Sequence, residues 1–223
     1  MKADLPEIKS VNDFLDWKST PGDDVEDINE KYADSLGWIN TDVMYSFLGI
    51  YALGVWVYNA DKFKVTDYYI FVKETNQSIY SEKFIRNIQN DSSYNLSELN
   101  GEIESLINVY FSVGNVMPIW PGGNKEKGVT KGCFDLPELF FARYYNWYLA
   151  LRRIYRGTLF LDGFIKKGTP KLKRYSCLRE FLKTIDTPEK YKKFLYTVCN
   201  NIKNREADIL EWIVTKNLME LNQ

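Results

Sequence analysis

The feature that most constrains the fold is a long apolar stripe near the C-terminus. Its members are Tyr191, Leu195, Val198, Ile202, Ile209 and Trp212, at intervals of 4, 3, 4, 7 and 3 residues. Intervals of three and four place side chains on one face of an α-helix. Thr187 is a suitable N-cap, and Pro188 fits the first helical position. The pattern therefore predicts a long terminal helix that needs a large apolar body to cover its face.

A second helix is predicted over residues 134–157. Asp135 can cap its first turn, with Glu138 three residues on, and Gly157 suits its C-terminal end. One face of this helix carries Leu136, Phe140, Arg143, Trp147, Leu151 and Ile154. This face is expected to turn toward the core.

Each of these two faces includes one arginine. Arg143 lies within the first, and Arg205 falls in the 7-residue gap between Ile202 and Ile209. A buried guanidinium is costly without partners, so each arginine should meet a carboxylate, main-chain carbonyls or a bound anion. Two interpretations stay open: an internal ion pair, or a pocket for an anionic group formed by Arg143, Arg205 and Lys131.

The remaining segments favour a mainly α protein. Residues 10–17, 41–59, 81–89 and 97–111 read as helices, and Ser10 can cap the first of them. Residues 62–75 read as a strand or hairpin, and 115–120 as a short strand or an extended segment. The apolar run at 44–58 is too short for a typical membrane span and reads as a buried helix. We therefore expect one compact helical domain, 1–223, with a minor β element; an α+β fold is the alternative.

Charge divides the chain into two parts. Residues 1–124 hold 9 Lys/Arg and 19 Asp/Glu, a net charge of −10, whereas residues 125–223 hold 20 and 11, a net charge of +9. The asymmetry fits a basic surface for polyanions, or an acidic part packed on the basic helical part at 134–223. A Gly/Pro-rich loop, 113–133, joins the two parts and is the expected lid or wall of any pocket at Arg143.

Composition excludes several kinds of chemistry. The chain has no histidine, which rules out Ser-His-Asp triads, Cys-His dyads and HExxH zinc sites. Its three cysteines form no CxxC pair, which fits a reducing cytoplasm and argues against zinc. The loop segment GNKEKGVT (123–130) has the glycine spacing of a Walker A loop, but Val129 stands where the lysine is required. We expect no cofactor and no metal.

A basic segment lies between the two predicted helices. The residues predicted to bind nucleic acid are Lys166, Lys167, Lys171, Lys173 and Arg174. Four aromatic residues are interleaved with the basic residues of 165–194: Tyr175, Phe181, Tyr191 and Phe194. Lysines that contact phosphates and aromatic rings that stack on bases are typical of single-strand binding. The alternative is an ordinary lysine-rich outer face.

Four stretches resemble blocks of an uncharacterised bacterial family: FLDWKSTPGDD (14–24), SVGNVMPIWPGGN (112–124), FDLPELFFARYY (134–145) and IKNREADI (202–209). That family carries an FDxR…PxGxD block, an IGN/IGG…WP/FP loop, an FDLT…RRxY helix and a late Arg-Asn pair. This chain departs from it at Lys18, at Ala142-Arg143 and at Glu206. The resemblance implies no activity, but it aligns Arg143 and Arg205 with family arginines.

Two functions remain open from the sequence. The first is a non-catalytic binding or regulatory protein, expected in bacterial or phage conflict, that engages nucleic acid or a protein through its basic half. The second is an enzyme or sensor that binds a small phosphorylated or carboxylated ligand at Arg143 and Arg205. The sequence favours the first, because it contains no recognisable catalytic motif. No membrane partner is expected, and the oligomeric state is left open.

Overall fold

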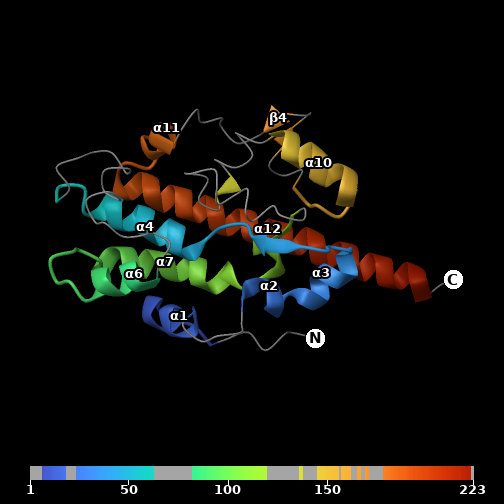
Figure 1. The fold of residues 1–223 in the computed structure, drawn as a ribbon, viewed down its shortest axis with the longest axis horizontal. Helices are drawn as coiled ribbons and strands as arrows, with labels where there is room; N and C mark the ends of the chain where they lie inside the picture. Colours follow the sequence, from blue (N-terminus) through green and yellow to red (C-terminus); the bar gives the residue numbers. More distant parts are fainter. Residues whose placement is uncertain are drawn as a thin grey trace.

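The computed structural model describes residues 7–18, 24–62, 82–119, 136–137, 145–155, 157–161, 165–166, 169–170 and 178–221. Within them the chain is mainly α-helical with a minor β element, which confirms the predicted fold class (Figure 1). The helices are α1 (Val11–Lys18), α2 (Val25–Ile28), α3 (Glu30–Leu36), α4 (Phe47–Tyr58), α6 (Glu82–Gln89), α7 (Ser97–Tyr110), the 3-10 turn η1 (Val113–Asn115), α10 (Tyr145–Tyr155), α11 (Leu178–Leu182) and α12 (Pro188–Leu221).

Helix α12 forms the axis of the molecule. It packs against α7, η1 and α4, and its C-terminal turns extend past α3 (Figure 1). The predicted start is confirmed, because the Thr187 carbonyl accepts from the Tyr191 amide at 2.9 Å. The predicted stripe is buried from Tyr191 through Ile209, whereas Trp212 is half-buried. The spacing of this segment therefore identified the face that meets the core.

Two small antiparallel sheets make up the β element of the described part. Strand β1 (Thr41–Val43) pairs with β2 (Val116–Pro118), with Val43 opposite Val116. The short strand or extended segment predicted at 115–120 is thus confirmed as a strand over Val116–Pro118, which ties the chain after α7 to the chain ahead of α4. Strands β3 (Ile165–Lys166) and β4 (Thr169–Pro170) form a separate pair.

The buried helix predicted at 41–59 is confirmed over Phe47–Tyr58 only, because residues 41–43 form strand β1 instead. In α4, nearly every residue from Phe47 to Val57 is buried, because α7 covers one side and α12 another. Aromatic rings extend this core toward α1, where the Phe14 and Phe47 centroids lie 3.9 Å apart. Helix α1 begins as predicted, with the Ser10 hydroxyl accepting from the Asp13 amide at 3.2 Å.

One core prediction in the second helix is wrong. Leu136 and Leu151 are buried as expected, but Ile154 is 52% exposed. Tyr155 is buried instead, and its hydroxyl donates to the Ile119 carbonyl at 2.8 Å. The tyrosine satisfies its polar atom while burying its ring, so the last turn of α10 faces the core with position 155 rather than 154.

Other predictions fall wholly or partly outside the described residues. Most of the strand or hairpin expected at 62–75 lies outside them, and so does the Asp135 cap of the 134–157 helix. None of the helices in the described part combines the length and hydropathy that crossing a membrane requires.

Candidate functional site

Arg205 lies in the core of the described structure, 2% exposed. Its Nη1 atom donates to the carbonyl oxygens of Gly114 (2.9 Å), Val113 (3.3 Å) and Val116, and Nη2 donates to Leu159 (3.2 Å). Main-chain carbonyls were one of the three partner types expected for this arginine. Within the described residues, Arg205 makes no ion pair with a carboxylate.

The Trp38 ring and the close approach of the loop at Gly114 also hold Arg205 in place. Its Cζ atom lies 5.3 Å from the centroid of the Trp38 ring, and the Trp38 indole donates to the Thr158 carbonyl at 3.0 Å. The loop can approach because position 114 is glycine: a Cβ atom there would lie 2.1 Å from the Ile202 carbonyl oxygen. Arg205 therefore joins α12 to η1, β2 and the segment that follows α10.

Burial lowers the pKa of Arg205 to about 9, so the side chain is still a cation at neutral pH. Four carbonyl dipoles compensate this charge, and the Nε atom has no hydrogen-bond partner among the described residues. Arg143 and Lys131, the other members of the predicted anion pocket, lie outside the described residues. A pocket formed by these three residues remains a prediction.

A carboxyl group of α2 has unusual protonation. Burial, with a smaller contribution from the charges of Asp42 and Asp24, raises the pKa of Glu26 to about 7. Such a group can exchange a proton near neutral pH. However, the part of the chain that the structure describes contains no cluster of His, Cys, Asp and Glu suited to a metal ion.

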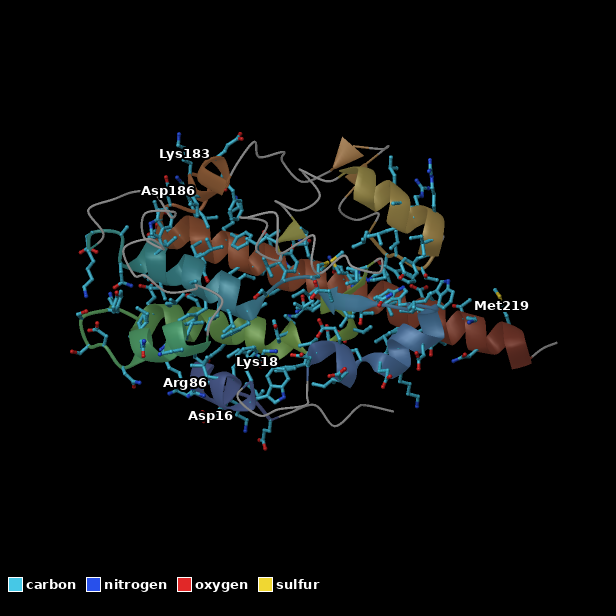
Figure 2. All side chains as sticks on the ribbon, in the orientation of Figure 1. Asp16, Lys18, Arg86, Lys183, Asp186 and Met219 are labelled. Atoms are coloured by element: carbon cyan, nitrogen blue, oxygen red, sulfur yellow. The ribbon has the colours of Figure 1, made fainter. Side chains whose placement is uncertain are left out.

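The described basic residues near α11 and α12 are partly neutralised. Lys190 pairs with Asp186 at 2.7 Å, and Lys192 pairs with Glu102 of α7 at 2.5 Å. Figure 2 shows Asp186 and Lys183 at the end of the molecule opposite Met219.

Two of the aromatic residues predicted to stack on bases are core residues. Phe181 is 1% exposed because its ring packs on Phe194 between α11 and α12. Tyr191 is 0% exposed because it packs against α4, where its hydroxyl donates to the Ile50 carbonyl at 2.9 Å. This part of the nucleic-acid prediction is wrong. The five candidate ligands Lys166, Lys167, Lys171, Lys173 and Arg174 have no described side chains, and their role remains a prediction.

The surface of α12 that turns away from the core has a regular pattern of its own. We define the outer face of α12 as seven residues at alternating intervals of four and three: Tyr196, Asn200, Lys203, Ala207, Leu210, Val214 and Asn217. Its apolar members are open to solvent, with Tyr196 68%, Val214 58% and Leu210 38% exposed. A large tyrosine and two branched aliphatic side chains thus share one exposed helix face.

This outer face was not predicted, although the sequence contains a signal for it. One helix carries two interleaved series of three- and four-residue intervals, and the more apolar series is the one that indicates the core. Tyr196 follows Leu195 directly, so it points about 100° away from the core stripe around the helix. An aromatic residue at such a position is an exposed ring, unlike Tyr191.

Comparison with known proteins adds no further assignment. No family model matches the chain, and neither a curated protein nor a solved structure matches it. The resemblance to an uncharacterised bacterial family therefore remains a prediction.

Proposed function

We propose that this chain is a non-catalytic interaction protein that binds another protein through the outer face of α12. The observation that carries the proposal is the regular row of exposed side chains on that face, with Tyr196, Leu210 and Val214 as its apolar members. Single exposed apolar residues are common on protein surfaces. A row with the spacing of a helix-packing seam is a surface that another helix can cover.

The packing of α12 on the side opposite its outer face supports the proposal. On its opposite side, α12 is fixed by α7, α4 and η1, and Arg205 also ties the helix to β2 and to the segment that follows α10. A helix held in this way keeps its backbone in place, so its exposed side chains project from fixed points. Binding then costs little conformational entropy on this side of the interface.

The described basic and aromatic residues near α11 and α12 give little support to nucleic-acid binding, so a protein is the better-supported partner. Lys190 and Lys192 are already paired with carboxylates, and the rings of Phe181 and Tyr191 are buried. The small-ligand alternative also has less support, because the Nη1 and Nη2 atoms of Arg205 donate to main-chain carbonyls.

Site-specific photo-crosslinking tests the proposal. The photoreactive residue p-benzoylphenylalanine would replace Tyr196 on the outer face, or Met219 in a matched control. Met219 is 62% exposed and lies on the projecting end of α12, on another side of the helix (Figure 2). Cells that express each variant are irradiated and their extracts are treated with nuclease.

We expect a nuclease-resistant, protease-sensitive adduct from position 196, and a much weaker one from position 219. An adduct that nuclease removes would identify a nucleic acid as the partner and refute the proposal. Equal yields from both positions would also refute it, because the outer face would then have no preference over another exposed surface.

A further inference from the structure

The outer face of α12 has the geometry of a coiled-coil seam. From Tyr196 to Asn217 the intervals average 3.5 residues, which is the repeat that keeps one helix aligned along another. At 1.5 Å per residue this stretch is about 33 Å long. Its best-fitting occupant is therefore a long helix with an exposed face of the same repeat.

The chain itself contains such a helix, since α12 meets both conditions. When two copies of the outer face are aligned antiparallel, layers form between matching positions. Ala207 then lies opposite Leu210 of the second copy, which pairs a small side chain with a large one. Asn200 lies opposite Asn217 of the second copy, so two amides that would be costly to bury alone can bond to each other.

Charge selects the antiparallel orientation. On or beside the outer face, Lys203 lies N-terminal to Ala207, whereas the exposed Glu211 lies C-terminal to it. Lys216, nearer the C-terminus, lies over the Trp212 ring on another side of the helix. A parallel pair would place like charges together. The antiparallel pair brings Lys203 within reach of Glu211 of the second copy, twice across the two-fold axis.

We infer that the outer face of α12 binds the outer face of a second copy of this chain in antiparallel orientation. The inference rests on the proposed function and names its partner. The C-terminal turns of α12 extend past α3 (Figure 1), so part of the helix projects beyond its neighbours. The self-complementary pairing follows from the sequence of one helix.

Sedimentation equilibrium of the full chain tests the inference, over a range of about 1 to 200 µM, where associations of ordinary strength are resolved. We expect the wild type to dimerise. In this register Lys203 lies opposite Val214 of the second copy, so the seam is tested at Ala207 instead. Ala207→Glu should weaken the dimer about tenfold or more, because it places a carboxylate against Leu210 of the second copy. Met219→Glu is the control, with the same new charge on another exposed side of α12, and should leave the dissociation constant unchanged. Both sites are exposed, so circular dichroism should show an unaltered fold.

Charge reversal tests the orientation. Lys203→Glu and Glu211→Lys should each weaken the dimer, and the double variant should restore it, because the reversed charges again meet as opposites. A double variant weaker than either single one would refute the antiparallel arrangement. A wild type that stays monomeric throughout would refute self-association.

The two proposals fail separately. A monomeric wild type that still crosslinks from position 196 to a different protein overturns the self-pairing but supports the proposed function. A monomer without any adduct refutes both.

Discussion

Replacing Arg205 with methionine should destabilise the protein by about 2 kcal/mol. The change removes donors from four main-chain carbonyls, those of Val113, Gly114, Val116 and Leu159. The Val113 carbonyl keeps a donor, because it also accepts from the Val116 amide. A buried carbonyl left without its donor costs about 1–3 kcal/mol. Taking the low end for the other three yields about 3 kcal/mol, and the apolar contacts of the methionine recover part of this. Urea denaturation followed by circular dichroism and tryptophan fluorescence measures the difference.

Arg152→Met is the matched control for this prediction. Arg152 is exposed on α10, so its replacement should change the free energy of unfolding by less than about 0.5 kcal/mol. A loss below about 1 kcal/mol for Arg205→Met would refute the reasoning, because the carbonyls would then have other donors. Thermal stabilisation of the wild type by phosphate, lost in Arg205→Met, would instead support the anion-pocket hypothesis.

Two further predictions concern packing and protonation. Gly114→Ala should cost at least about 2 kcal/mol, because its Cβ would lie 2.1 Å from the Ile202 carbonyl. Gly101→Ala, in open space on α7, should instead stabilise the fold by about 1 kcal/mol; equal effects in urea denaturation would contradict this packing. Burial raises the pKa of Glu26 to about 7 in the folded state, so stability is lost as pH rises from about 4.5 through 7. Glu26→Gln should match the wild type below pH about 4.5 and exceed it at pH about 8 by at most about 3 kcal/mol, and parallel pH profiles would refute the assignment.

Local sequence signals predicted much of the described fold. Thr187 and Pro188 marked the start of α12, Ser10 marked the start of α1, and three- and four-residue spacing placed Arg205 in the core. These predictions succeed because capping and periodicity depend on residues close together in the chain. The partners of Arg205 could not be predicted, since carbonyl acceptors exist at every residue and only the tertiary path brings Gly114 to α12.

Helix periodicity also left the choice between neighbouring positions open. Ile154 and Tyr155 are adjacent in α10, and the apolar scale favours the isoleucine, yet the tyrosine is buried because its hydroxyl reaches the Ile119 carbonyl. Tyr191 and Tyr196 differ in the same way, one in the core and one on the outer face. The candidate interaction surface depends on this distinction.

The central claim is that a protein covers the outer face of α12 in the cell. Its most direct test is thiol labelling of Val214→Cys and Met219→Cys variants in intact cells, with a membrane-permeant maleimide and site-resolved mass spectrometry. Both positions are well exposed in the single chain, at 58% and 62%. We predict that position 214 labels much more slowly in cells than in dilute purified protein, while position 219 labels at similar rates in both. The claim would be contradicted if the ratio of the labelling rate in cells to that in purified protein were the same at positions 214 and 219. The outer face would then be as open in the cell as it is in one isolated chain.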